Sequence, residues 1–491
     1  MAIIFLFKYK LLKKIYEVDM NNRLPLLEEV LKYHKEKNLI LSMPGNKSGI
    51  GFLKDDIGKE FVSTMGYLDI TEVGNLDNFH HPEGVIKEAQ ELLAKLYKAD
   101  RAYFLVNGSS SGNLASIFAA FNEGDEVLVE RNCHKSIYNG LILRKLKPVY
   151  IEANIDLDNG ILLPCSEKNI EEALTKAKHP RGIILTSPNY YGISCNLEKI
   201  LRKLKANGLK ILIDAAHGAH YGINKKLPEG MVRLAHYVVL SAHKTLPALT
   251  QGAYLLVNDI YSNVEFFISA FNTTSPSYLI MSSLDYARYY LENYGDADYE
   301  SLIDLAEVYK NQINSLDKVI ILSEDDIEGN YKLDKSRYIM ILPVGYSGNK
   351  LLEYLLENKI QSEMSFSRGV VLILSPFNRR EDFEKIYQAI MFLDIETLKE
   401  EEKNIGYVNL EKVKRLEPFE VHNSGFEEVE INNAVGRISK DFIVPYPPGI
   451  PLVLPGEEIT EDVVKAIRWY QGKCISILGI YYNRIKVIKE I

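Results

Sequence analysis

Six short apolar runs recur between residues 100 and 260. Several of them contain almost no polar residue, which is typical of strands that are buried on both faces of a sheet. The runs are RAYFLV (101–106), DEVLVE (125–130), KPVYIEA (147–153), RGIILTSP (181–188), LKILIDAAH (209–217) and HYVVLSAHK (236–244).

Amphipathic stretches separate these runs. NIEEALTKAKH (169–179) and NLEKILRKLKANG (196–208) place apolar residues at helical spacing, and the second ends on a glycine of the kind that terminates helices. Strands that alternate with helices at this spacing predict a mostly parallel α/β sheet with right-handed crossovers. Ligands of such sheets collect at the carboxyl ends of the strands.

The pattern changes along the rest of the chain. One helix is predicted at 24–38, helices recur at 280–310, and the charged stretch 394–404 is predicted to be a helical linker. The four predicted parts are an N-terminal extension and arm (1–75), a large domain that carries the sheet (76–315), a smaller α/β domain (316–395) and a C-terminal domain (405–491).

The composition excludes several classes of protein. The 491 residues are 46% hydrophobic and 25% charged, as in globular proteins, and a net charge of −8 gives no basic surface for non-specific nucleic-acid binding. Four scattered cysteines are too few for a disulfide framework and favour the reducing cytoplasm. No segment approaches 18 uninterrupted apolar residues, so we predict no membrane span.

The N-terminal end leaves the start of the protein open. AIIFLF (2–7) lies before the lysines rather than after them and lacks a small-residue cleavage site, so it makes a poor signal peptide. Translation from Met1 and translation from Met20, with residues 1–19 as an extension, are equally compatible with the pattern.

The stretch FLVNGSSSGNLAS (104–116) is a candidate phosphate site. An apolar run leads into Gly108 and three serines, and a helix follows. Backbone N–H groups at a helix N-terminus, together with serine hydroxyls, can bind an anion. Residues 107–113 therefore form the candidate, although an ordinary helix cap has the same pattern.

Two further polar residues follow apolar runs. His134 comes after DEVLVE and opens a predicted helix, where its ring could stack on a flat ligand or could simply cap the helix. Asp214 ends LKILID, and a carboxylate there is costly to bury unless it is paired. A protonated heterocyclic nitrogen is a suitable partner, and the small Ala215 and Ala216 would let a flat ring lie against the backbone.

Lys244 follows the apolar run HYVVL, 30 residues after Asp214. A lysine that attacks an aldehyde needs a dry pocket that lowers its pKa. Ser241 and His243 flank it and could reach a phosphate. His217 and His220 indicate a polar pocket. Their spacing of three with no suitable third ligand disfavours a metal site, and none is predicted.

Taken together, these residues match the needs of one cofactor. A phosphate site, a ring-stacking histidine, an acid for a pyridinium nitrogen and a lysine for an aldehyde follow one another on successive strand ends. Pyridoxal 5′-phosphate requires this set of groups. The pattern therefore predicts that Lys244 is its covalent anchor.

The sequence resembles the pyridoxal-phosphate-dependent ornithine/lysine/arginine decarboxylases of prokaryotic type, in their short form, over residues 20–491. The motifs that carry the resemblance are NGSSSGN (107–113), RNCHKS (131–136), DAAHGAH (214–220), SAHKTLPALTQGA (241–253), TSPSYLIMSSLD (274–285) and PYPPGIPLVLPGE (445–457). The resemblance implies fold type I, that of aspartate aminotransferase. This α/β fold has a large, mostly parallel seven-stranded sheet flanked by helices, with smaller α+β domains toward the C-terminus.

The resemblance also implies roles for single residues. Lys244 would form the Schiff base, Asp214 would pair with the ring nitrogen, and His243 or Lys244 would move a proton during the reaction. His134 would stack on the ring as a catalytic group. The remaining implied cofactor contacts are Ser109, Ser110, Ser241 and His243 at the phosphate, Ala216 on the opposite ring face, and His217 in the pocket.

A substrate site shared between subunits is implied in the same way. Thr273 and Ser275 belong to a segment that lies near a neighbouring subunit's active site in this family. Glu457 matches an acidic residue that receives the distal cationic end of the substrate. The resemblance thus implies a homodimer, or a higher homo-oligomer, with shared active sites.

The N-terminal arm departs from the family pattern. The usual PGHK is PGNK here, with Asn46 in place of histidine. A histidine is often found three residues before the Pro-Gly step in this family, whereas here Ser42 stands two residues before Pro44. These changes put in doubt any role of this loop in closing the site. DEAH is DAAH, with Ala215, while His80 and His81 keep an expected histidine pair.

The implied activity is decarboxylation of a basic L-amino acid. Arginine, which would yield agmatine and CO2, is the first expectation. Lysine (cadaverine) and ornithine (putrescine) are the alternatives, and any of these reactions would serve polyamine synthesis or acid tolerance. Another fold-type-I enzyme, such as an aminotransferase, is a more remote alternative. A cofactor-bearing regulator would need a basic DNA-binding segment, which the sequence lacks.

Overall fold

The computed structural model describes residues 24–400, 410, 412–446, 451–472 and 475–489. Some sequence predictions concern residues outside these ranges. They are the extension 1–19, the choice between Met1 and Met20, residues 447–450 of the proline-rich motif, and the end of the predicted linker helix. The described start of that linker is a short 3-10 helix, Ile395–Leu398.

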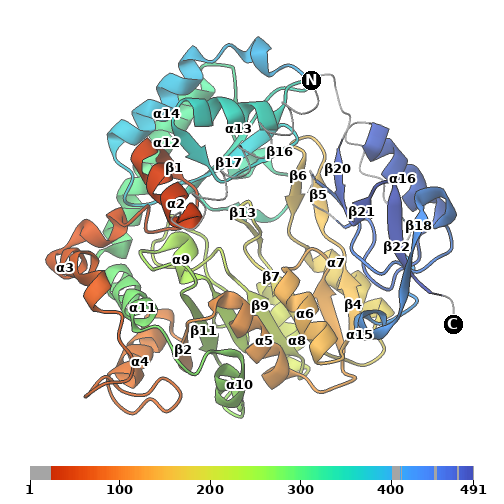
Figure 1. Ribbon diagram of the computed structural model, residues 1–491, viewed down its shortest axis with the longest axis horizontal. Helices are drawn as coiled ribbons and strands as arrows, with labels where there is room; N and C mark the ends of the chain where they lie inside the picture. Colours follow the sequence, from red (N-terminus) through yellow and green to blue (C-terminus); the bar gives the residue numbers. More distant parts are fainter. Residues whose placement is uncertain (1–23, 401–409, 411, 447–450, 473–474, 490–491) are drawn as a thin grey trace, which may run out of the picture.

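A seven-stranded sheet, the large sheet, lies at the centre of the molecule (Figure 1). All strands run in the same direction except β11, which is antiparallel to both of its neighbours. Across the sheet the order is β2 (Arg101–Leu105), β11 (Ala253–Val257), β10 (Tyr237–Leu240), β9 (Lys210–Asp214), β7 (Pro180–Thr186), β3 (Glu126–Glu130) and β4 (Lys147–Ile151).

Six of these strands coincide with the six apolar runs, and the predicted α/β fold with a mostly parallel seven-stranded sheet is confirmed. β9 and β10 show why the pattern was informative, because their residues from Ile211 to Asp214 and from Tyr237 to Leu240 are all buried. The predicted domain boundaries stay predictions.

Helices cover both faces of the large sheet (Figure 1). α5 (Gly108–Ala120) packs across β2, β11, β10 and β9, with α6 (Lys135–Leu143) and α10 (Val264–Phe271) against it. The other helices around this sheet are α4 (Val85–Tyr97), α7 (Glu167–Lys176), α8 (Glu198–Ala206), the short α9 (Ala242–Thr245), α11 (Tyr278–Tyr290) and α12 (Asp296–Asn314).

A second, antiparallel sheet, the small sheet, follows in the chain. It contains β12 (Ile320–Ile321), β14 (Arg337–Ile341), β17 (Gly369–Ile373) and β16 (Met364–Phe366), in that order. α13 (Gly348–Glu357) packs on it, and α14 (Arg380–Phe392) packs on α12. Some of its buried residues, such as Tyr338, Met340, Val370 and Leu372, belong to the main hydrophobic core, while Ile339, Ile341, Phe366 and Val371 belong to a separate cluster.

Two separate strand pairs join segments near the small sheet to other parts of the chain. β1 (Leu39–Leu41) pairs with β15 (Ile360–Ser362), and β8 (Ile193–Cys195) pairs with β13 (Tyr331–Leu333). A hairpin of β5 (Asn154–Asp156) and β6 (Ile161–Leu163) lies beside them. The N-terminal arm also contains α2 (Pro25–Glu36) and α3 (Asp56–Thr64), and α2 matches the helix predicted at 24–38.

The C-terminal segment, residues 410–489, has a hydrophobic core of its own. Its elements are α15 (Pro418–Asn423), β18 (Phe426–Glu430), β19 (Val444–Tyr446), α16 (Glu461–Gly472), β20 (Ser476–Leu478), β21 (Ile480–Tyr481) and β22 (Arg484–Ile488). α15 packs on α6 of the large sheet. Across the whole described part of the chain, no helix is both long enough and apolar enough to cross a membrane.

Candidate active site

Four of the predicted site residues follow parallel strands of the large sheet. Gly108 comes after β2, His134 after β3, and Lys244 after β10, while Asp214 is the last residue of β9. Because parallel strands end at the same edge of a sheet, these positions lie along one edge. The site is therefore built on rigid elements of the core.

The predicted phosphate site has free hydrogen-bonding groups. Asn107 provides no side-chain cap for α5, so the first N–H groups of this 13-residue helix are not capped by it. Gly108 makes the turn into the helix with φ +75°, a left-handed conformation that favours glycine. Ser241 Oγ is buried without a hydrogen-bond partner among the described residues. A bound anion would satisfy these donors, so the residues fit a phosphate group.

A chain of hydrogen bonds holds the predicted acid and the predicted stacking histidine together. Asn113 Nδ2 donates to Asp214 Oδ2 and to Ser136 Oγ, both at 2.9 Å. Ser136 Oγ lies 2.8 Å from His134 Nδ1, and the Ser136 N–H donates to the same nitrogen at 3.2 Å. The backbone N–H of Ala216 donates to Asp214 Oδ1 at 3.2 Å. The buried carboxylate is thus fixed on both oxygens, as an acid facing a ring nitrogen requires.

Lys244 lies in a pocket lined by histidine and arginine. Its Nζ is 3.0 Å from His217 Nε2, and His217 Nδ1 is 3.2 Å from Arg337 Nη2, at the start of β14. The Tyr190 ring meets the His217 ring edge-on, with centroids 4.8 Å apart. The small sheet therefore contributes a charged group next to the predicted anchor.

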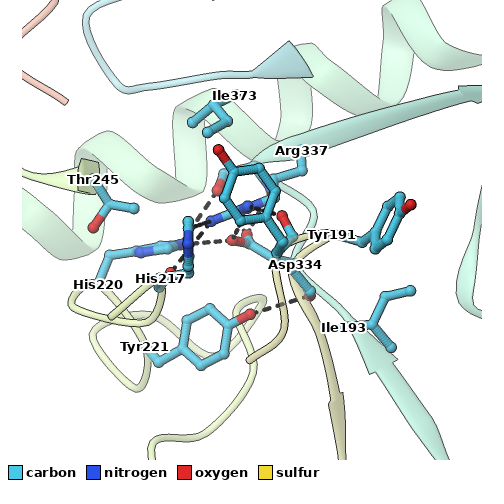
Figure 2. A network of polar contacts seen from close by, with 12 residues as sticks. Tyr191, Ile193, His217, His220, Tyr221, Thr245, Asp334, Arg337 and Ile373 are labelled. Carbon is cyan, nitrogen blue, oxygen red and sulfur yellow. Dashed lines mark hydrogen bonds and ion pairs between the residues drawn. The ribbon is translucent and has the colours of Figure 1, made fainter. Parts of the chain in front are cut away.

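A buried carboxylate, that of Asp334, accepts a hydrogen bond from Arg337. Asp334 has no exposed surface and accepts hydrogen bonds from His220 Nε2 at 2.9 Å, Ser336 Oγ at 2.6 Å and Arg337 Nε at 3.4 Å. Figure 2 shows His217, His220, Asp334 and Arg337 converging on one point. Burial alone would raise the pKa of Asp334, but the His220 imidazole and the Arg337 guanidinium outweigh it, so this pKa lies below its usual range.

The surroundings lower the pKa of the predicted anchor. Burial is the main cause of the lowered pKa of Lys244, the Arg337 guanidinium adds to it, and the Asp214 carboxylate opposes it. Burial, followed by the positive charges of Lys244 and Arg337, holds the pKa of His217 well below its usual value. A lowered pKa suits a lysine that must attack an aldehyde, because only the neutral amine is nucleophilic.

His243 has a defined orientation. Its Nδ1 lies 2.9 Å from the carbonyl oxygen of Gly252, and because a carbonyl only accepts, Nδ1 carries the proton. In the neutral ring Nε2 then has the lone pair. Burial also lowers the pKa of His243. This arrangement suits the acceptance and return of a proton.

The N-terminal loop that contains Asn46 packs directly on α9, the short helix that contains Lys244, and on the residues that follow it. The Gly45 N–H donates to the His243 carbonyl at 2.7 Å, and Asn46 Nδ2 donates to the Ala248 carbonyl at 2.9 Å. A Cβ at Gly45 would lie 2.4 Å from the Thr245 backbone, so only glycine fits there. Asn46 is buried and supports the loop after Lys244. At Ser42, the backbone carbonyl accepts from Lys47 Nζ at 2.6 Å.

The structure does not bring the predicted substrate residues to this pocket. Both oxygens of Glu457 bind Arg131 at 2.6 Å, and both residues are almost fully buried, so this carboxylate already has its cationic partner. Thr273 and Ser275 are exposed on the surface, where the Thr273 carbonyl lies 3.0 Å from His80 Nε2. A substrate role of Glu457 would require the ion pair to open.

Some residues of the site could not be predicted from the sequence. Asn113 lay inside the candidate phosphate stretch, but no pattern singled it out from its neighbours. Asp334 and Arg337 lie in DKSR, a polar turn of the small domain with no signal of its own. They are recognised as part of the site only because, in the folded chain, Arg337 contacts His217. Within the described ranges, no group of histidine, cysteine or acidic side chains could hold a metal ion.

Comparison with known proteins shows the family of the chain. The family model for the major domain of Orn/Lys/Arg decarboxylases matches residues 24–330, and the model for their C-terminal domain matches residues 417–473. A protein of Bacillus anthracis named arginine decarboxylase is 30% identical over 482 residues, covering 95% of this chain and 97% of that protein. The inducible lysine decarboxylase of Escherichia coli K12 is 25% identical, covering 93% and 78%.

The fold has solved counterparts. The lysine decarboxylase of Francisella novicida superposes with a TM-score of 0.75 at 20% identity, covering 91% of this chain and 78% of that one. The two family models match well over half of the residues in the expected order, which confirms the predicted family and, with it, the predicted cofactor. The chain belongs to the Orn/Lys/Arg decarboxylases, whose cofactor is pyridoxal 5′-phosphate.

Proposed function

We propose that this protein decarboxylates a basic L-amino acid, and that arginine, converted to agmatine and CO2, is its substrate. The observation that carries the reaction type is the placement of Lys244 beside His217, at the sheet edge that also holds Asp214. The choice of arginine is supported by the relatives. The Bacillus anthracis protein named arginine decarboxylase is 30% identical, whereas the Escherichia coli K12 protein named inducible lysine decarboxylase is 25% identical. Lysine is the next candidate.

Each residue would contribute a distinct step. When bound, the cofactor supplies an electron sink for the electron pair that the departing carboxylate leaves behind. Asp214, fixed by Asn113 and Ala216, would hold a proton at the ring nitrogen and so maintain that sink. Lys244 would hold the cofactor until the substrate amine displaces it. Lys244, or His243 through Nε2, would then return a proton to the substrate carbon.

The small-sheet arginine weighs against an aminotransferase. An enzyme that binds the substrate carboxylate in the plane of the ring needs an arginine with free donors. Arg337 has no exposed side-chain surface, and its nitrogens already bind Asp334, the Tyr190 carbonyl and His217. Arg337 is therefore already engaged and not poised to hold the substrate carboxylate in the plane of the ring, as an aminotransferase would require.

The first experiment is product analysis. The purified protein, loaded with pyridoxal phosphate, is incubated separately with arginine, lysine and ornithine, and the amine formed is identified. We expect agmatine from arginine. Cadaverine or putrescine alone would overturn the substrate but keep the reaction, and a requirement for a keto acid would overturn the reaction itself.

A second experiment tests the anchor. Borohydride reduction of the loaded protein, followed by peptide mass spectrometry, should place the cofactor on Lys244, and Lys244→Ala should abolish turnover. Lys226, an exposed lysine paired with Asp304, provides the control substitution Lys226→Ala, which should leave labelling and activity unchanged. Labelling of another lysine, or undiminished turnover by Lys244→Ala, would refute the assignment.

We also propose that the protein is a homodimer with shared active sites, joined partly through α2. This helix has no buried residue, and its side chains Leu26, Leu27, Val30 and Leu31 are 79%, 51%, 55% and 49% exposed. A row of exposed leucines and valine suits a second copy of the chain. The exposed Thr273 and Ser275 would then face the neighbouring subunit's site.

Light scattering tests the dimer. The wild type should have twice the mass of one chain, and the double substitution Leu27→Glu, Leu31→Glu should shift it toward the monomer. Glu29→Lys, on the same helix, is the matched control and should stay dimeric. A monomeric wild type would contradict the proposal.

A cytoplasmic location and a role in polyamine supply or acid tolerance complete the proposal. Cys133, Cys165 and Cys195 are buried free thiols, which fit a reducing compartment. The reaction forms an amine and consumes a proton, and either result would serve such a role. Enzyme found outside the cytoplasm after cell fractionation would contradict the location.

A further inference from the structure

Three side chains from two sheets form a line that ends at Lys244. Lys244 lies in the short helix α9 and His217 in the turn after β9, both at the edge of the large sheet, whereas Arg337 is the first residue of β14 in the small sheet. His217 lies between the other two, with Nε2 at 3.0 Å from Lys244 Nζ and Nδ1 at 3.2 Å from Arg337 Nη2. Each nitrogen of the imidazole thus faces a different basic group.

Donor and acceptor counting assigns the proton on His217. A guanidinium has only donors, so the imidazole nitrogen that faces Arg337 must accept. His217 Nδ1 is therefore unprotonated, and the ring proton of the neutral imidazole lies on Nε2. A doubly protonated ring would bring a third positive charge between two basic groups in a buried pocket, which is costly.

The same counting assigns the protonation of Lys244. With its proton on Nε2, His217 is a hydrogen-bond donor toward Lys244 Nζ. An ammonium group has no lone pair and cannot accept, whereas a neutral amine can. The opposite arrangement, an ammonium that donates to Nε2, would place an Nδ1–H against the Arg337 donor. The contacts therefore require a neutral Lys244.

Arg337 is held too firmly to adapt. Its side chain has no exposed surface, Nη1 donates to the Tyr190 carbonyl at 2.7 Å, and Nε faces Asp334. Asp334 is itself fixed by His220, which stacks on the Tyr299 ring at 5.2 Å with an interplanar angle of 16°. The guanidinium therefore keeps its donors on His217.

We propose that Arg337 is a positioning residue that fixes His217 as the Nε2–H tautomer, and that His217 in turn holds Lys244 as the neutral, nucleophilic amine. The proposal deepens the proposed function and rests on Lys244 as the anchor. Through Arg337, the small sheet would keep Lys244 ready to capture the cofactor. It would also keep Lys244 ready to take the cofactor back from its substrate-bound form. Ionisable groups that act on Lys244 or are acted on by it are Asp214, His217, His134, His243, Arg337 and Glu363.

The first test observes the tautomer in the wild-type apoprotein. Nitrogen NMR of protein labelled with ¹⁵N-histidine distinguishes a protonated ring nitrogen from an unprotonated one, and His217→Asn identifies the signal. We expect a neutral ring with the proton on Nε2 at neutral pH. A proton on Nδ1, or a doubly protonated ring, would overturn the proposal.

The second test measures cofactor capture, not turnover. The rate at which the apoprotein captures pyridoxal phosphate is followed against pH, because only the neutral amine reacts. Arg337→Met removes the donor and its charge, so the midpoint of this profile should move up by about one pH unit, and capture should slow at pH values below the new midpoint. Arg337→Lys keeps a donor-only cation and should restore much of the wild-type profile.

A matched control removes a buried arginine elsewhere. Arg288 of α11 pairs with Asp285 and Glu292, and Arg288→Met should leave the capture midpoint unchanged. An unchanged midpoint in Arg337→Met would overturn the proposal. If that variant does not fold, the His217 tautomer measured by NMR in the wild type tests the proposal instead. Borohydride labelling away from Lys244 would instead refute the anchor, so the two failures are distinguishable.

Discussion

A single amide connects the two groups expected to flank the cofactor ring. Asn113 is fully buried on α5, and its Nδ2 donates to both Asp214 and Ser136, which in turn orients His134. An aspartate in this position would repel Asp214, and a small apolar residue would leave that carboxylate with one partner fewer. The identity of residue 113 therefore determines how well the acid is preorganised.

Replacement of Asn113 by alanine should weaken the site without unfolding the protein. A hydrogen bond to a charged group contributes about 1.5–3 kcal/mol, so kcat/KM should fall by roughly 10- to 150-fold, and the cofactor should dissociate more readily. Steady-state kinetics and the Kd of pyridoxal phosphate measure both effects. Ser116→Ala, a buried polar change on the same helix, should have little effect; equal losses in the two variants would mean a general packing defect.

The N-terminal loop acts between elements. Lys47 is almost fully buried and donates to the carbonyls of Ser42 at 2.6 Å and of Ile373, at the end of β17, at 3.0 Å. Burial is the largest cause that lowers the pKa of Lys47, to about 7, with Glu363 opposing it and Arg337 adding to it. This lysine joins the loop under the active-site lysine to the small sheet.

The lowered pKa of Lys47 predicts a pH dependence of stability. Between pH 7 and the ordinary lysine value of 10.5, the unfolded chain binds a proton that the folded chain does not, so stability rises with pH across this window. The gain is at most about 5 kcal/mol. Urea unfolding of the wild type and of Lys47→Met, from pH 7 to 10, should show a shallower rise for the variant. Parallel curves would contradict the prediction.

At the same scale, the sequence predicts strands better than it predicts contacts between them. Apolar runs identified β9 and β10 because both faces of these strands are buried, and polar residues at their ends identified the site edge. β11 is equally apolar, but the pattern does not set it apart as a strand of its own, because AYLLV follows the lysine motif closely in the chain. Its antiparallel direction has no local signal.

Site residues from the small sheet were beyond local patterns. DKSR is a common type of polar turn, and only the approach of β14 to the large sheet gives Arg337 its place against His217. Local sequence also does not reveal the partner of Glu457. The motif identified an important carboxylate, but its partner Arg131 lies at the end of a distant strand.

At the scale of the whole molecule, Arg131 joins the C-terminal segment to the large sheet. The C-terminal segment has its own core, and the buried ion pair between Arg131 and Glu457 attaches it to the rest of the protein. Arg131 lies three residues before His134 in the chain. Lys412 adds a second contact, to Glu152 at 2.5 Å. A buried, two-bond ion pair in this position transmits the placement of the C-terminal segment to the active-site edge.

Loss of one partner of the pair should be costly. Glu457→Gln and Arg131→Met should each destabilise the protein by about 3–5 kcal/mol, because a buried charge is left alone, and the double variant should lose less than the sum. Denaturant unfolding and KM for arginine are measured together. Glu458→Gln, which breaks the exposed pair with Arg415, should cost about 1 kcal/mol or less. A raised KM in Glu457→Gln alone, without lost stability, would favour the substrate role instead.

The separations in sequence between these partners bear on how the chain folds. His217 and Arg337 are 120 residues apart, Asn113 and Asp214 are 101 apart, and Arg131 and Glu457 are 326 apart. Contacts of such high order close large loops, so they form late and make folding slow. On the ribosome, the lysine emerges well before the arginine that prepares it. The nascent chain should therefore acquire its capacity to take up cofactor only after the small sheet has been synthesised.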